Sequence, residues 1–99
     1  MVAVKLTQLF VAHDTRGLDV LTDTVLDHLA SNENGTLFDA DVSAELTSGL
    51  VEVSVLATGS DFDDAVSHAS DAIDRAERAA GAAASFDELS RQAELVVFA

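Results

Sequence analysis

Two segments of this chain, which begin at Val4 and Val51, repeat one pattern. Each opens on a strand-like run ("VKLTQLFVA" and "VEVSVLATG"), continues with a helical pattern and ends on a further strand pattern. A chain of 99 residues supports a single hydrophobic core, so both halves must share that core. The repeat therefore predicts one domain, residues 1–99, built from two β-α-β units.

Two helices are predicted from apolar residues spaced three and four apart. The first spans residues 18–31 and ends at residues 32–35, and its apolar stripe consists of Leu18, Leu21, Val25 and Leu29. The second spans residues 60–81, and its stripe consists of Phe62, Val66, Ala69, Ile73, Ala76 and Ala80. We expect Ser60 and Asp63 to form a capping box at the start of the second helix.

Four strands are predicted, at residues 2–12, 38–46, 51–57 and 93–99, because apolar and β-branched residues alternate there. A further capping-box pattern, from Ser85 to Glu88, predicts a short helical turn before the last strand. With no proline in the chain, this order matches an α+β, ferredoxin-like βαββαβ sandwich. We expect a four-stranded antiparallel sheet of order 4-1-3-2, with both helices on one face and the other face open.

The hairpin between the two middle strands carries several acidic residues. A tight turn at residues 48–49 would place Glu45 opposite Glu52, and like charges opposed on a sheet cost up to ~1 kcal/mol. Because the repeat aligns Lys5 with Glu52, we expect Lys5 to lie beside this pair. Two interpretations stay open: a partly neutralised, solvated face, or a divalent-metal site, which open strands serve less well than loops. We expect the solvated face and no metal.

The open face also carries apolar residues, which form a candidate association patch. Alternation assigns to it Leu9, Val11, Leu56, Val96 and Phe98. A symmetric dimer would cover such a patch twice, so a homodimer is expected. The alternative is a bulge near Gln8 that turns Leu9 and Val11 inward.

The charge balance restricts the partners. Five basic and 18 acidic residues give a formal net charge of −13, which repels nucleic acid and anionic membranes and suits a protein partner with a basic surface. There is no cysteine, and the sequence has neither a signal-peptide pattern nor an apolar run of ~20 residues, so a cytoplasmic location is expected.

No motif points to catalysis. The sequence has no GxGxxG, P-loop or GxSxG pattern and no tyrosine or tryptophan, so no nucleotide or flavin cofactor is expected. His13 beside Asp14 is expected to be a surface histidine where a strand meets a helix, with Asp14 or Thr15 as the N-cap. His28 and His68 lack metal-ligand spacing. An enzyme is therefore not expected.

Residues 11–30, "VAHDTRGLDVLTDTVLDHLA", resemble the opening of an ACT domain, a regulatory module of this topology. Asp14, Gly17 and Leu18 match the family's Asp, Gly and Leu before helix one, although Arg16 stands where a proline is usual. The resemblance implies a bound amino acid contacted by Asp14, Thr15, Gly17 and Leu18. The second half also resembles small stand-alone proteins of actinobacteria and their phages.

These observations predict a small acidic protein-protein interaction module that associates with itself and is phage-encoded or regulatory. The alternative is an ACT-like domain that binds an amino acid. An acidic inhibitor that mimics DNA is less favoured, because the acids are spread over helices and sheet rather than arranged in rows.

Overall fold

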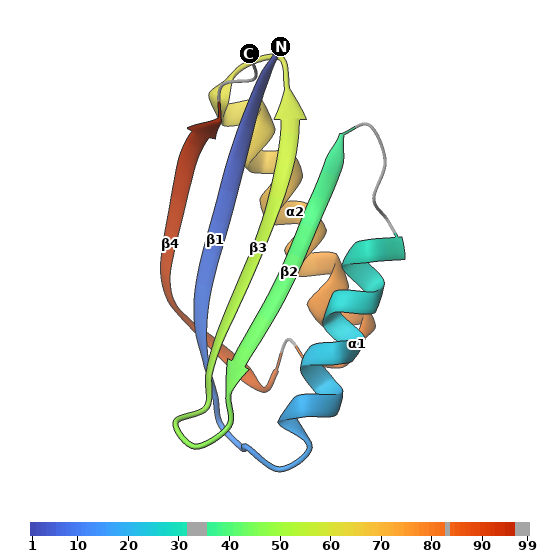
Figure 1. Cartoon of the computed structure of the whole chain (residues 1–99), viewed down its shortest axis with the longest axis vertical. Helices are drawn as coiled ribbons and strands as arrows, with labels where there is room; N and C mark the ends of the chain where they lie inside the picture. The colour runs from blue at the N-terminus through green and yellow to red at the C-terminus, as the bar shows by residue number, and fades with distance from the viewer. Residues whose placement is uncertain (32–35, 83, 97–99) are drawn as a thin grey trace.

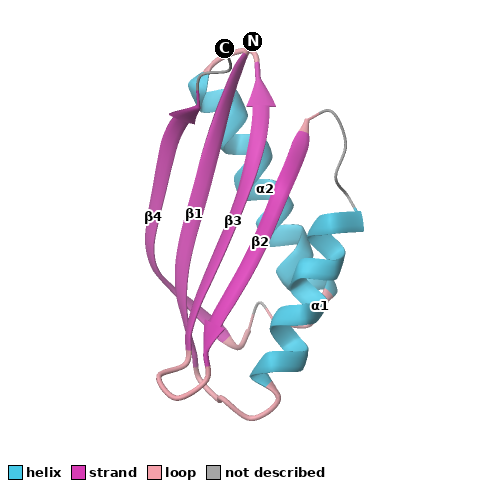
Figure 2. Cartoon of the chain, viewed as in Figure 1, coloured by secondary structure: helices cyan, strands magenta, loops and turns pink. Residues whose placement is uncertain are grey.

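The structure, a computed structural model, describes residues 1–31, 36–82 and 84–96. Its elements are β1 (Val2–Ala12), α1 (Leu18–Ser31), β2 (Leu37–Glu45), β3 (Leu50–Gly59), α2 (Phe62–Ala79) and β4 (Phe86–Val96). The strands form one antiparallel sheet in the order β2-β3-β1-β4, and both helices cover the same face of it (Figures 1 and 2). The predicted ferredoxin-like fold and its strand order are confirmed. The predicted helix stop at residues 32–35 lies outside the described residues.

The core lies between the sheet and the two helices. Its largest fully buried side chains are Leu6, Leu18, Ile73, Val4, Val25, Val51, Val53 and Val55. Each such side chain stabilises the fold by about 1.5–3 kcal/mol relative to exposure. Most of the predicted α1 stripe is buried, and Thr22 joins it by donating its hydroxyl hydrogen bond to the Leu18 carbonyl at 2.9 Å.

The helices cover the sheet unevenly. α1 packs mainly against β2, and α2 packs mainly against β3 and β1. β4 lies at the edge beside β1, and most of its residues are exposed. The helix-side surface at β4 is therefore left partly open beside α2.

The β2–β3 hairpin has a longer turn than predicted. Glu45 lies opposite Leu50 and Ser43 opposite Glu52, so the predicted opposition of Glu45 and Glu52 is wrong. Residues 46–49 form the turn, in which the Gly49 N–H donates to the Glu45 carbonyl at 2.9 Å and Gly49 has a φ of 78°. The register moves by two residues, which keeps the same side chains on each face because strand alternation has a period of two.

Lys5 does not lie beside Glu52. β1 and β3 are antiparallel, so Lys5 pairs with Leu56 and Glu52 pairs with Leu9. On its other side Lys5 lies opposite Glu94 of β4. The repeat aligned these positions in parallel, and the antiparallel register separates them.

β4 replaces the predicted helical turn. Residues from Phe86 onward are strand, whereas Ser85 to Glu88 had the pattern of a capping box. Tertiary contacts outweigh that local pattern: the His13 N–H donates to the Ser85 carbonyl at 2.9 Å, and the rings of Phe10 and Phe86 lie 5.9 Å apart. The last strand therefore starts earlier than predicted.

The cap of α2 is one residue later than predicted. Asp61 is the N-cap, and its carboxylate accepts from the Asp64 N–H at 2.8 Å. The Asp64 carboxylate in turn accepts from the Ser60 N–H at 2.8 Å, which holds its pKa below the usual range. The pairing of Ser60 with Asp63 is therefore wrong, although the helix starts in the predicted region.

Both edge strands contain a bulge. In β2 the register shifts between Phe38 and Asp41, where Asp39 has a φ of 52°. The shift places Phe38 opposite Leu56 on the open face, instead of on the packed side with Ala40. In β4 the shift falls at Leu89.

Candidate functional site

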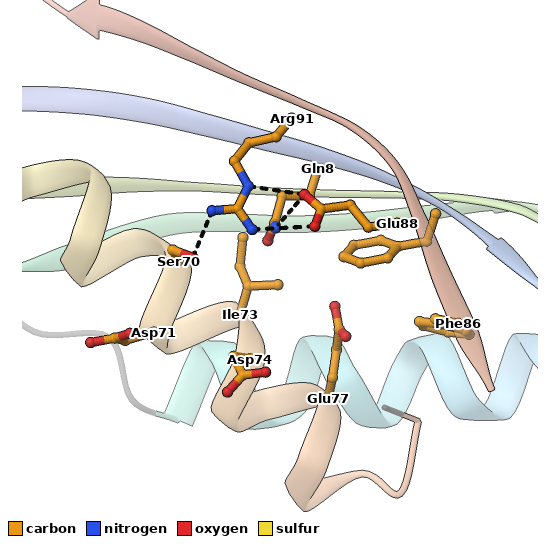
Figure 3. Close-up of a pocket in the computed structure, with 10 residues that line it drawn as sticks. Gln8, Ser70, Asp71, Ile73, Asp74, Glu77, Phe86, Glu88 and Arg91 are labelled. Carbon is orange, nitrogen blue, oxygen red and sulfur yellow. Dashed lines mark hydrogen bonds and ion pairs between the residues drawn. The ribbon is translucent and has the colours of Figure 1, made fainter. Parts of the chain in front are cut away.

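A cleft of about 370 Å³ lies on the helix side of the sheet, between α2 and the β1–β4 pair (Figure 3). Its apolar wall is formed by Phe10, Ile73 and Phe86, and its polar groups come from all three elements. The cleft exists because α2 packs over β1 and β3 rather than over β4. Its volume is in the range of small-molecule sites.

Arg91 and Glu88 form the β4 side of the cleft. The Arg91 Nε donates to Glu88 Oε1 at 2.9 Å and its second terminal nitrogen donates to Glu88 Oε2 at 3.3 Å. Arg91 also reaches across to α2, where it donates to the Ser70 hydroxyl at 3.1 Å. The hydrogen bonds from Arg91 hold the pKa of Glu88 below its usual range. This network fixes the outer wall of the cleft.

Gln8 projects into the cleft from β1. It is only 4% exposed, and its amide nitrogen donates to Glu88 Oε1 at 3.1 Å. Since a carboxylate accepts and does not donate, the nitrogen must face Glu88 and the amide oxygen must face away. That oxygen is buried and has no hydrogen-bond partner within the described part of the chain.

Glu77 points into the cleft from α2, as Figure 3 shows. It is 7% exposed, and its Oε1 is buried with no hydrogen-bond partner among residues 1–31, 36–82 and 84–96. Burial, together with the negative charges of Asp74 and Glu88, raises the pKa of Glu77 to about 7. An unsatisfied buried polar group costs about 1–3 kcal/mol, and the cleft contains two such groups.

Neither Gln8 nor Glu77 was identified from the sequence, although both left a signal. Gln8 lies between Leu6 and Phe10 on the packed side of β1, where alternation calls for an apolar residue. Glu77 lies four residues after Ile73 on the buried side of α2. A polar residue at an inward position is the signal that could have located this cleft.

The predicted association patch is divided by the sheet register. Leu9 and Val11 lie on the open face, where Val11 pairs with Leu50. Leu9 and Leu50 line a shallow hollow of about 260 Å³, together with Glu45 and Glu52. Alternation in β1 continues through Gln8, so the alternative of a bulge there is wrong.

The other members of the patch lie elsewhere. Leu56 pairs with Phe38 toward the β2 edge, and Val96 pairs with Ala3 near the start of β1. Phe98 is outside the described residues. The patch is therefore several small apolar areas, separated by polar residues, rather than one continuous surface.

His13 and His68 contact polar groups of neighbouring elements. His13 Nε2 lies 2.5 Å from Asp87 Oδ2, which links the end of β1 to the start of β4. His68 Nδ1 lies 2.8 Å from the Thr58 carbonyl oxygen, and His28 lies on α1. Within the described ranges, no group of three or more His, Asp or Glu side chains is arranged to hold a metal ion.

In the loop that resembles an ACT domain, the residues form hydrogen bonds with one another. Arg16 donates to both carboxylate oxygens of Asp14, at 3.0 Å and 3.1 Å from its Nε, and lowers the Asp14 pKa to about 2. The Leu18 N–H donates to the Thr15 carbonyl at 3.2 Å. Gly17 takes a φ of 69°, and Leu18 is buried in the core. The Asp14 carboxylate is therefore paired with Arg16 within the loop. Because α1 begins at Leu18, Asp14 is not its N-cap.

Among the described residues, no helix combines the length and apolar character that crossing a membrane requires. The resemblance of residues 11–30 to an ACT domain rests on the sequence pattern alone. A scan against protein-family models gives no match, and a search of curated proteins gives no significant match.

Proposed function

We propose that this protein is a non-catalytic binding module that holds a small polar ligand in the cleft between α2 and β4. The observation that carries the proposal is the pair of buried oxygens, Gln8 Oε1 and Glu77 Oε1, that have no partner within the described ranges. Buried polar groups in folded proteins are nearly always paired, so a ligand that donates hydrogen bonds to both would remove an existing cost. The function keeps the ligand-binding hypothesis drawn from the sequence but moves the site from Asp14–Leu18 to this cleft.

A chemical-shift titration tests the proposal. Amides of the ¹⁵N-labelled protein are followed during addition of the 20 common amino acids and a panel of small amines, alcohols and carboxylic acids. We expect at least one compound to shift the resonances of Gln8, Glu77 and Arg91 and to raise the melting temperature by mass action. Glu77→Gln should weaken that response. If no compound at millimolar concentration shifts the cleft resonances, the proposal is wrong.

Association through the open face is a second candidate function. The supporting observation is the hollow beside Leu9 and Leu50, which is flanked by Glu45 and Glu52. Two copies facing each other would bring these glutamates together, whereas a basic protein surface would complement them. We therefore propose a basic protein partner for this face, and the homodimer expected from the sequence stays a prediction.

An amphipathic lysine-leucine peptide is a suitable probe for this face. Leu9→Asp adds negative charge, so binding driven by charge alone would stay equal or strengthen, whereas docking on the apolar hollow would weaken. Val20→Asp is the matched control, because Val20 is exposed on α1. Weaker binding by Leu9→Asp alone supports the partner surface, and equal binding by both variants refutes it. A dimer in light scattering that Leu9→Asp dissociates would instead assign the face to a second copy.

A further inference from the structure

The free hydrogen-bonding capacity of the cleft is that of an acceptor. Gln8 is held with its amide nitrogen on Glu88, which leaves the oxygen as the free group. Glu77 supplies a carboxyl group whose Oε1 is also unpartnered within the described part of the chain. Arg91, the cationic donor of the cleft, already binds Glu88 and Ser70. When Glu77 is ionised, as at pH 8, a complementary ligand must therefore carry N–H or O–H donors.

The charges around the cleft select among such ligands. Among the described lining residues, Asp71, Asp74 and Glu77 of α2 and Glu88 of β4 are acidic and Arg91 is basic. Arg78, outside the lining, pairs with Asp74 at 3.2 Å. Gln8, the polar lining residue from β1, is uncharged. With Glu77 ionised, acidic groups outnumber basic ones by several, and this field favours a cation over a neutral or anionic ligand.

The apolar part of the cleft wall is small, because Phe10, Phe86 and Ile73 are only 5%, 7% and 1% exposed. The rings of Phe10 and Phe86 lie 5.9 Å apart, and Ile73 lines the cleft from α2. An aromatic face attracts a cation and also accommodates a hydrocarbon chain. The site thus combines acceptors, negative charge and an apolar wall within about 370 Å³.

We propose that the ligand of this cleft is a small organic primary ammonium ion with an apolar body, which donates hydrogen bonds to Glu77 and Gln8 and lies against Phe10 and Phe86. The inference rests on the proposed binding function and names its ligand class. An ammonium group has three donors, more than the two unpartnered oxygens require. The raised pKa of Glu77 agrees with this assignment, because a bound cation would restore its ionised form.

The test compares three probes of similar shape and different charge. 2-Phenylethylamine is cationic, 2-phenylethanol is neutral and 3-phenylpropionate is anionic, and putrescine and agmatine extend the amine set. Binding is measured at pH 8 by calorimetry and by the amide shifts of cleft residues. We expect an amine to bind at least about tenfold more tightly than the alcohol, the difference that one charge-assisted hydrogen bond produces. The anion should not bind.

Variants locate the contact. Glu77→Gln should weaken amine binding at least about tenfold, and Gln8→Leu should weaken it too. Asp27→Asn on the exposed surface of α1 makes the same change in net charge as Glu77→Gln, and should alter binding by no more than about twofold. Binding should also weaken at pH 5.5, where Glu77 is protonated.

The outcomes separate the ligand class from the function. If the alcohol or the anion shifts the cleft resonances as strongly as the amines, the cleft binds ligands but the ammonium assignment is wrong. If the amines bind equally well to Glu77→Gln and to Asp27→Asn, the assignment is also wrong. If none of the compounds shifts the cleft resonances, both the assignment and the proposed binding function fail.

Discussion

Glu77 makes the stability of the free protein depend on pH in an unusual direction for an acidic residue. Burial raises its folded-state pKa from 4.5 to about 7, so in that interval the folded protein holds a proton that the unfolded chain has released. The stabilising contribution of the protonated group is complete below pH 4.5 and is lost as pH rises toward 7. Each pH unit in this interval lowers the free energy of unfolding by about 1.4 kcal/mol, so the total loss is about 3 kcal/mol.

Replacement of Glu77 by glutamine isolates this effect, because glutamine has nearly the same shape and no titration. Urea unfolding of both proteins is followed at several values between pH 5 and pH 8. At pH 5 the two free energies of unfolding should nearly agree. At pH 8 the Glu77→Gln protein should be more stable, by about 2–3 kcal/mol.

The same measurement contains its own control. Asp14, Asp64 and Glu88 have lowered pKa values, so their contributions change at more acidic pH and cancel when two variants are compared. Asp27→Asn should leave the pH profile parallel to that of the unmodified protein. A difference between Glu77→Gln and the unmodified protein that is the same at pH 5 and pH 8 would refute the reasoning, because it would mean that burial does not hold the carboxyl in its protonated form.

Three substitutions test the packing that positions the cleft. A Cβ on Gly59 would lie 2.4 Å from the Ala65 backbone nitrogen, so Gly59→Ala should lower the melting temperature and cost about 3 kcal/mol; a neutral effect would contradict this close approach of β3 to α2. Asp61→Ala removes the acceptor for the Asp64 N–H and should cost about 1 kcal/mol by urea unfolding, unless another group caps the helix. Leu6 is fully buried, and Leu6→Ala should cost about 2–5 kcal/mol in the same assay; a loss below about 1 kcal/mol would place it outside the core.

The fold could be predicted because its signals are periodic and repeated. The stripe from Leu18 to Leu29 and the alternation of β1 and β3 each specify an element, and the internal repeat fixes how the elements are arranged. Details that depend on single residues could not be predicted in this way. The turn at residues 46–49 and the bulge at Asp39 each change the register between β2 and β3. Neither alters the hydrophobic pattern of the sequence enough for the change to be predicted.

The cleft escaped prediction for a different reason. Its shape depends on where α2 lies across the sheet, which no local pattern specifies. The start of β4 also depends on contacts of Phe86 with Phe10 and of Ser85 with His13, which join residues far apart in the sequence. Gln8 and Glu77 could have been noted as polar residues at inward positions, but only the packed structure brings them to one cavity.

The two bulges have a consequence for how sheets of different molecules meet. They fall in β2 and β4, the two strands whose outer edges have no neighbour in the sheet, while the pairing of β1 with β3 runs without interruption from Val2 to Val11. An uninterrupted edge offers a row of backbone groups on which another chain can add as a strand and begin a fibril. Here Asp39 and Leu89 break that row on each side, so the molecule limits aggregation through its backbone as well as through its negative charge.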